Sequence, residues 1–161
     1  MTLIHHLTHT QRVASAFNWA VLAHTGQTYN KLPYWTHLLT VANNLIDPTE
    51  TELVAALLHD IVEDTYVTVA DVRESFGDKV ADIVDLVTQH KGLSYAANIA
   101  RITESGNLSA MRVKLADNKA NIESDKSIMD PERAASLTER WKKSRESIIL
   151  AMAFHMEAPH A

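Results

Sequence analysis

Apolar residues recur at helical spacing along almost the whole chain, and no stretch alternates cleanly between apolar and polar residues over five or more positions. This periodicity predicts an all-α fold, a helical bundle of about eight helices. The helices are expected at about residues 8–24, 34–46, 51–64, 68–77, 78–90, 94–105, 108–122 and from 130 to near the end. Residues 24–33 are predicted to form a loop.

The residue types at the predicted helix ends support these boundaries. Side-chain N-caps are expected at Thr8 (with Gln11), Thr51, Thr68 and Ser94. Gly77 suits a left-handed C-cap, because glycine has no Cβ that would clash there. Asp130-Pro131-Glu132 is a typical start for the last helix. No repeat or linker interrupts this order, so residues 1–161 are predicted to form a single domain.

The composition is that of a globular protein, with 46% hydrophobic and 22% charged residues. No apolar run approaches the ~18 residues of a membrane-spanning helix. The N-terminal MTLIHHLTHT also lacks the basic-then-apolar order of a secretory signal. We therefore expect a cytoplasmic protein without a membrane partner. The chain has no cysteine, which excludes disulfides, thiolate zinc sites and cysteine nucleophiles.

The net charge of −5 is unevenly distributed along the chain. Residues 50–90 contain ten acidic residues against only Arg73 and Lys79. This acidic middle argues against nucleic-acid binding, which needs a basic stripe. It is compatible with a site for a divalent cation, because such an ion needs carboxylates near it.

The most informative segment is LVAALLHDIVEDT, residues 53–65. Its apolar run leads into His59-Asp60 and, one helical turn later, into Glu63-Asp64. Three acids and an imidazole thus gather at the end of a hydrophobic helix that carries no lysine or arginine. Burying them unpaired would cost roughly several kcal/mol each. A bound divalent cation would remove that cost, since imidazole and carboxylate suit a first-row metal.

A histidine and an aspartate elsewhere extend this cluster. His37 lies among apolar residues of the predicted second helix, and taken alone it is typical of a satisfied core residue. Asp117 follows the apolar start of VKLADNKANI (113–122), and taken alone it is typical of the surface. Together with His59-Asp60, and in this order, the two favour a shared metal site. The histidines near the chain ends are interpreted as surface residues without function: His5, His6, His9, His155 and His160.

The order His … His-Asp … Asp resembles the signature of the HD-domain phosphohydrolase superfamily. More narrowly, the chain resembles the hydrolase domain of RelA/SpoT-type alarmone enzymes and their stand-alone relatives, the small alarmone hydrolases. The matching segments are AHTGQ (23–27), PYWTH (33–37), LVAALLHDIVEDT (53–65), FGDKVADIV (76–84), VT (87–88) and VKLADNKANI (113–122). The resemblance implies a metal-dependent hydrolase that removes the 3′-pyrophosphate of ppGpp or pppGpp and leaves GDP or GTP.

The same resemblance implies roles for individual residues. It implies one manganese ion held by His37, His59, Asp60 and Asp117. Glu63 and Asp64 match the pair that positions or activates the attacking water, and either can accept its proton. Asn121 and Ser124 match polar positions near the substrate ribose and 3′-phosphate.

Basic residues are expected to hold the remaining phosphate charge. The candidates are Lys31, Arg101, Lys114, Arg140 and Lys143. The basic cluster around Arg140 is, taken alone, typical of a solvated helix face. The family places a basic residue on its last helix, which favours Arg140.

Two departures from the family pattern are visible. The loop after AHTGQ is one residue short and reads Thr28-Tyr29-Asn30-Lys31, where relatives carry an arginine that packs against guanine. Tyr29 can stack on a base instead, which predicts weaker discrimination between guanine and adenine. Alternatively, Tyr29 packs against the protein and Lys31 takes over the contact. The usual KLADR also reads KLADN, with Asn118 replacing the arginine.

Two other functions stay open. The altered loop favours an HD-type phosphohydrolase that acts on another nucleotide, a deoxynucleoside monophosphate or NADPH. A non-catalytic module that sequesters a nucleotide is the second alternative, although a pure binder has no need of the water-activating pair Glu63-Asp64. The expected partner is a small-molecule nucleotide, and the sequence leaves a homodimer open.

Overall fold

The computed structural model describes residues 9–157 and confirms the all-α prediction. Its helices are α1 (His9–Ala23), α2 (Trp35–Asn43), α3 (Glu50–Leu58), α4 (Ile61–Asp64), α5 (Val69–Phe76), α6 (Asp78–Val87), α7 (Tyr95–Glu104), α8 (Leu108–Glu123) and α9 (Pro131–Glu157). No helix within this range is long and apolar enough to cross a membrane. The predictions for Thr8, His5, His6 and His160 fall on residues outside the described range.

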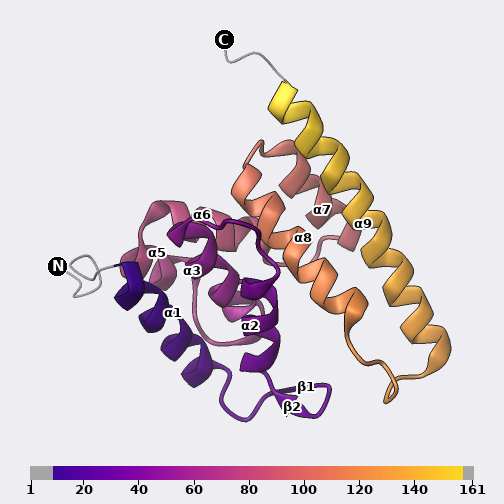
Figure 1. Cartoon of the computed structure of the whole chain (residues 1–161), viewed down its shortest axis with the longest axis horizontal. Helices are drawn as coiled ribbons and strands as arrows, with labels where there is room; N and C mark the ends of the chain where they lie inside the picture. Colours follow the sequence, from indigo (N-terminus) through magenta and orange to yellow (C-terminus); the bar gives the residue numbers. More distant parts are fainter. Residues whose placement is uncertain (1–8, 158–161) are drawn as a thin grey trace.

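Helix α3 lies at the centre of the bundle and packs against α1, α2, α6 and α8 (Figure 1). Its residues from Val54 to Leu58 are all buried, so every face of the helix is covered by a neighbour. A helix that is apolar all round is stable only in such a place. The C-terminal end of α3, where His59 and Asp60 follow, is therefore held inside the protein.

The long helix α9 packs against α7 and α8 on one side of the bundle (Figure 1). The buried side chains of Asn118 on α8 and Ser144 on α9 join the two helices through a hydrogen bond of 2.8 Å. Asn118 is thus part of the helix packing. Near its end, α9 places the half-buried His155 against α7, where its ring nitrogen donates to the Thr103 carbonyl oxygen at 2.9 Å. The prediction of a surface His155 is therefore wrong.

The start of α3 differs from the prediction that Thr51 caps it. Thr49 is the N-cap, and its hydroxyl accepts from the Glu52 backbone N–H at 3.2 Å. The Glu52 carboxylate in turn accepts from the Thr49 N–H at 2.9 Å, which completes a capping box. The pattern Thr49-x-x-Glu52 was present in the sequence and identifies the correct cap. Thr68, Ser94 and Asp130 cap their helices as predicted.

The predicted third helix is interrupted, so the described residues contain nine helices and not eight. Helix α3 ends at Leu58, and the single turn α4 begins at Ile61. Between them Asp60 has φ −100° and ψ −2°, in the sparsely populated region where active-site residues often lie. Gly77 joins α5 to α6 with the predicted positive φ of 86°, but its ψ of 173° is not that of a left-handed C-cap.

The predicted loop between α1 and α2 contains a small hairpin of β1 (Thr28–Tyr29) and β2 (Leu32–Pro33). Asn30 and Lys31 form its two-residue turn with φ of 48° and 67°. Positive φ at both turn positions is the geometry that twists two strands into a tight hairpin. The segment between α1 and α2 thus forms a short, paired loop.

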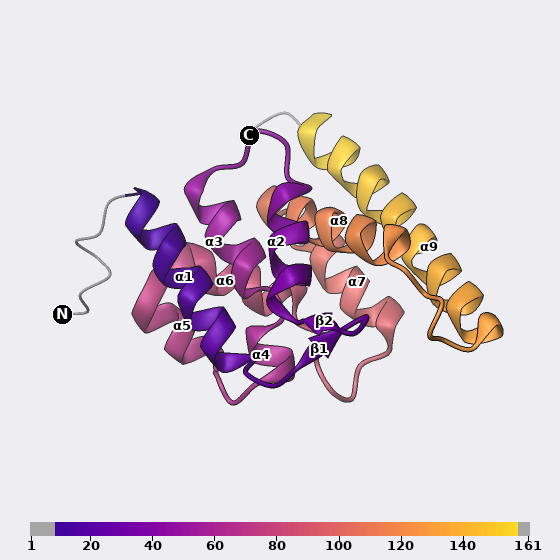
Figure 2. The ribbon, with the colours of Figure 1, turned by 60° about the horizontal axis from the view of Figure 1, so that its bottom comes forward.

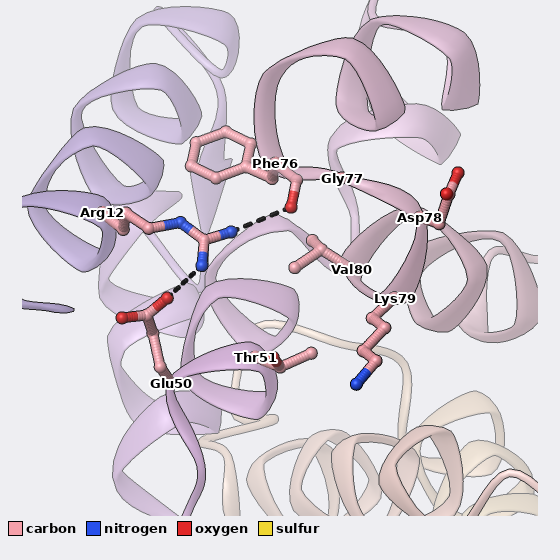
Figure 3. A pocket seen from close by; sticks show the side chains of 8 residues that line it. All are labelled: Arg12, Glu50, Thr51, Phe76, Gly77, Asp78, Lys79 and Val80. Atoms are coloured by element: carbon pink, nitrogen blue, oxygen red, sulfur yellow. Dashed lines mark hydrogen bonds and ion pairs between the residues drawn. The ribbon is translucent and has the colours of Figure 1, made fainter. Parts of the chain in front are cut away.

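Arg12 ties together the end of the bundle formed by α1, α3 and α5. Its guanidinium forms an ion pair with Glu50 and donates to the Phe76 carbonyl oxygen at 2.9 Å (Figure 3). These residues line a cavity of about 400 Å³ that continues past Thr51 and Gly77 to Lys79. None of the residues predicted to bind metal or substrate lines this cavity.

Candidate functional site

Three parts of the bundle bring the predicted site residues together. Helix α2 carries His37, the junction of α3 and α4 carries His59 and Asp60, and α8 carries Asp117. Helices α2, α3 and α8 pack against one another, so these side chains meet although they are far apart in the sequence. The hairpin β1–β2 and α4 lie at the same end of the bundle (Figure 2).

The two histidines and two aspartates form one compact group. The Nε2 atom of His37 lies 3.3 Å from Asp117 Oδ1 and 3.6 Å from Asp60 Oδ2. The Nε2 atom of His59 lies 2.9 Å from Asp60 Oδ2 and 3.6 Å from Asp117 Oδ1. The potential ligand atoms of His37, His59 and Asp60 all lie within 4.8 Å of one another. The four residues predicted as ligands are thus together.

The chemistry of this group fits a divalent metal. The Nδ1 atom of His59 lies 2.7 Å from the Ala56 carbonyl oxygen, a contact that requires a proton on Nδ1 and leaves Nε2 as the nitrogen that can bind a metal. This buried Nε2 atom lies close to Asp60 Oδ2 but forms no hydrogen bond with any of the described residues. Two imidazole nitrogens and two carboxylates are a typical donor set for a first-row metal.

The carboxylates of this group stay ionised although they are buried. Burial opposes ionisation of Asp60, but the neighbouring His59 outweighs it and lowers the pKa of Asp60 to about 2. Burial likewise opposes ionisation of Asp117, and the Lys114 ammonium keeps the pKa of Asp117 well below its ordinary value. Burial opposes protonation of His59, but Asp60 and Asp117 outweigh it and raise the pKa of His59. The site therefore concentrates negative charge that attracts a cation.

Two neighbours on α8 fix the orientation of Asp117. The Lys114 ammonium donates to Asp117 Oδ2 at 2.8 Å, and the Asn121 amide donates to Asp117 Oδ1 at 2.6 Å. Burial disfavours the charged form of Lys114, but Asp117 outweighs this and raises the pKa of Lys114. Both residues, predicted as substrate contacts, thus lie beside Asp117, where they hold its carboxylate.

Glu63 and Asp64 lie on α4, at the exposed edge of the site. The Glu63 carboxylate accepts from the Gln89 backbone N–H at 2.9 Å, and the Asp64 carboxylate accepts from the Tyr34 hydroxyl at 3.1 Å. Loss of surrounding water raises the pKa of Glu63, with the charges of Asp60 and Asp64 adding to the effect. The same cause, followed by the charge of Asp60, raises the pKa of Asp64. Carboxylates with raised pKa values are suited to accept a proton near neutral pH.

Sequence reasoning missed three residues that support the site. Tyr34 donates to Asp60 Oδ2 at 2.7 Å, and its ring stacks on the buried His24 at 4.5 Å. Gln27 donates from its side chain to the Asp64 carbonyl oxygen at 2.9 Å. His24 and Gln27 belong to the segment AHTGQ, and Tyr34 belongs to PYWTH. From these two segments only His37 was predicted from the sequence as a site residue. The signal for Tyr34 was its position three residues before His37, where side chains at the start of a helix share a face.

The ring of Tyr29 is placed against the protein. It stacks on His37 with a centroid distance of 4.5 Å, and its hydroxyl donates to the Asn121 side-chain oxygen at 2.8 Å. Ser124 lies one turn further along, where its hydroxyl donates to the Asn121 carbonyl oxygen at 2.8 Å. These contacts favour the second alternative for Tyr29, in which it packs against the protein.

The other basic residues predicted to bind phosphate contact other side chains or are exposed. Arg101 pairs with Asp85 at 3.2 Å. The Arg140 guanidinium lies over the ring of Tyr95, 4.3 Å from its centroid, and the Tyr95 hydroxyl donates to Asn118 at 3.4 Å. Lys31 is exposed in the hairpin turn. The structure thus brings Lys114 to the metal-ligand group, whereas it records no contact from Lys31, Arg101 or Arg140 to the four proposed ligands.

Comparison with known proteins shows which family the chain resembles. A family model described as an HD domain matches residues 14–124. A guanosine-3′,5′-bis(diphosphate) 3′-pyrophosphohydrolase of Aquifex aeolicus is 34% identical over 102 residues, which cover 61% of this chain and 14% of that protein. The bifunctional (p)ppGpp synthase/hydrolase SpoT of Escherichia coli is 40% identical over 89 residues, or 53% of this chain and 12% of that protein.

A solved structure supports the fold assignment. A metazoan ortholog of SpoT, described as hydrolysing ppGpp, superposes with a TM-score of 0.68 at 24% identity, and the match covers 89% of this chain and 93% of that one. The chain spans less than a fifth of the length of the curated relatives it matches. An HD domain and the His/Asp group together indicate a divalent metal site. The family match over residues 14–124 confirms the resemblance seen in the sequence, and the chain belongs to the HD-domain family.

Proposed function

We propose that this protein is a manganese-dependent hydrolase that removes the 3′-pyrophosphate of ppGpp and pppGpp, leaving GDP and GTP. The observation that carries the proposal is the meeting of His37, His59, Asp60 and Asp117 beside the acidic pair on α4. The names of the relatives from Aquifex aeolicus and Escherichia coli support the choice of substrate.

In this proposal His37, His59, Asp60 and Asp117 hold the metal. Their ligand atoms already lie close together, so little rearrangement of side chains is needed. When bound, the metal supplies a Lewis acid for the phosphoryl group and the attacking water. Lys114 and Asn121 keep the Asp117 carboxylate in one orientation, as groups behind metal ligands commonly do.

Glu63 and Asp64 are proposed to orient the attacking water and to accept its proton. Both carboxylates lie at the exposed edge of the site, where water and a substrate can reach them. Glu63 is held by the Gln89 N–H and Asp64 by the Tyr34 hydroxyl, which leaves acceptor capacity on each carboxylate. We propose that Arg140, Lys31, Arg101, Asn121 and Ser124 contact the ribose and the phosphates.

The decisive test incubates the pure protein with Mn²⁺ and ppGpp and separates the products. We expect GDP and pyrophosphate in equal amounts. Removing the metal with a chelator should abolish turnover, because the His/Asp group alone supplies no Lewis acid, and added Mn²⁺ should restore it. Mg²⁺, Co²⁺ and Zn²⁺ tested in parallel identify the preferred ion. Release of a single phosphate, or no release at all, would contradict the proposal.

The same assay separates the two alternative functions. A deoxynucleoside monophosphate and NADPH are included, with phosphate as the product to detect. Preferred turnover of either would favour an HD-type phosphohydrolase with another nucleotide substrate. Tight binding of ppGpp without any product would favour the sequestering module.

The cytoplasmic location and the homodimer stay predictions.

The contacts of Tyr29 lead to a prediction about base selectivity. Tyr29→Ala removes the ring that packs on His37, so we expect kcat/KM for ppGpp and ppApp to fall together, each by about 10-fold. The ratio of the two values should stay the same, because in this arrangement Tyr29 acts on His37 and not on the base. Tyr29→Phe is the matched control, which keeps the ring and removes only the hydroxyl that contacts Asn121. A change in the ppGpp/ppApp ratio would show that Tyr29 contacts the base.

A further inference from the structure

Tyr34 joins the two parts of the site, the proposed metal ligands and the acidic pair. Its hydroxyl lies 2.7 Å from Asp60 Oδ2 and 3.1 Å from Asp64 Oδ2. Asp60 precedes the single turn α4 and Asp64 ends it, and the Asp64 N–H donates to the Asp60 carbonyl oxygen at 3.0 Å. One hydroxyl group therefore lies against two carboxylates that repel each other, and its single proton is shared between them, with the shorter contact to Asp60.

Contacts of the Tyr34 ring and of the Tyr34 backbone fix the position of this hydroxyl. The Tyr34 ring stacks on the buried His24 at 4.5 Å with an angle of 12° between the planes. The Tyr34 N–H donates to the Gln27 carbonyl oxygen at 3.1 Å. The side-chain oxygen of Gln27 accepts a hydrogen bond from His24 Nδ1 at 2.9 Å. The same Gln27 amide donates to the Asp64 carbonyl oxygen. Gln27 thus holds both Tyr34 and Asp64 in place.

The hydroxyl is a permanent donor. The ordinary pKa of a tyrosine hydroxyl is about 10. The proton therefore stays on the phenol oxygen throughout the neutral range. A carboxylate oxygen offers two lone pairs, so the Tyr34 O–H can occupy one on Asp60 Oδ2 and leave the other directed at the histidines. Asp60 Oδ2 is indeed the atom that lies 2.9 Å from His59 Nε2.

We propose that Tyr34 is a positioning residue that fixes the carboxylates of Asp60 and Asp64 relative to each other. Through Asp60 it presents one oxygen to the metal, and through Asp64 it orients one carboxylate of the acidic pair toward the attacking water. The role at Asp64 rests on the proposed function, whereas the role at Asp60 concerns metal binding alone. Tyr34 itself does not contact the reacting atoms.

The test begins with Tyr34→Phe, which keeps the ring on His24 and removes only the hydroxyl. Titration with Mn²⁺ in the absence of nucleotide should give a Kd raised by about 10-fold, the usual effect of losing a group behind a metal ligand. At saturating Mn²⁺ we expect kcat for ppGpp to fall by about 10-fold with an unchanged KM, because Asp64 has lost its donor. Tyr66→Phe is the matched control, since Tyr66 is 80% exposed, and should change neither value.

A double-mutant cycle distinguishes positioning from a general structural effect. In an Asp64→Asn background, Tyr34→Phe should cause no further fall in kcat, because the residue through which it acts on turnover is already lost. The Kd for Mn²⁺ should still rise in that background. An unchanged Kd, or independent effects of the two changes on kcat, would overturn the proposal. If the wild type hydrolysed no nucleotide, the proposed function would fail, while the Mn²⁺ titration would still decide the role of Tyr34 at Asp60.

Discussion

Asp60→Asn should abolish both metal binding and turnover. Asp60 is the proposed ligand closest to His59, and its carboxylate carries a full negative charge because the pKa of Asp60 is lowered to about 2. An amide of the same size keeps the shape but removes that charge. We expect the Kd for Mn²⁺ to rise by more than ~10²-fold, beyond the effect of a residue behind a ligand. Turnover of ppGpp should become undetectable at the Mn²⁺ concentration that saturates the wild type.

The measurement is a Mn²⁺ titration of the pure variant, followed by the ppGpp assay over increasing Mn²⁺. Asp82→Asn is the matched control, because Asp82 is an exposed acid on α6 that pairs with Arg73. It should bind Mn²⁺ and turn over substrate like the wild type. Wild-type Mn²⁺ affinity in Asp60→Asn would show that Asp60 is not a ligand. The melting temperature without metal should fall, because the pKa of Asp60, lowered to about 2, means that the folded protein favours the charged carboxylate that the variant lacks.

Most of the fold could be predicted because its signals are local. The helical periodicity places α5, α7 and α8 within a few residues of their observed ends, and the side chains of Thr68 and Ser94 cap α5 and α7. The break between α3 and α4 is not a local signal. Leu58 and Ile61 keep helical spacing on either side of His59 and Asp60, so the apolar pattern shows no interruption there. The hairpin escaped prediction because its strands are only two residues long.

The sequence could also predict which residues the site contains, but not how they support one another. The spacing of His37, His59-Asp60 and Asp117 carries the resemblance, and the structure brings all four together. By contrast, no pattern reveals that Tyr29 packs on His37. Lys114 was expected to meet a phosphate and instead pairs with Asp117 three residues later on α8, a spacing at which helical side chains meet and which the sequence does show. The contact of Tyr29 depends on side-chain directions in separate elements, which sequence spacing does not determine.

Glu63→Gln should separate metal binding from chemistry. The Glu63 side chain accepts a hydrogen bond from the Gln89 N–H, and the glutamine oxygen can accept the same bond, so the fold and the Mn²⁺ affinity should be retained. The amide cannot accept a proton from water. We therefore expect kcat for ppGpp to fall by at least ~10²-fold, the usual effect of losing a general base. Glu104→Gln, an exposed glutamate at the end of α7, is the matched control.

The pH dependence of turnover then identifies which carboxylate acts as the base. A base works only when it is deprotonated, so kcat should fall as the pH drops through its pKa. Because loss of water raises the pKa of both Glu63 and Asp64, this fall should occur at a higher pH than an ordinary carboxylate gives. If Glu63 is the base, the residual activity of Glu63→Gln should lose this acidic limb while Asp64→Asn keeps it. The opposite result, with near wild-type turnover in Glu63→Gln, would assign the proton to Asp64, the carboxylate that Tyr34 holds in place.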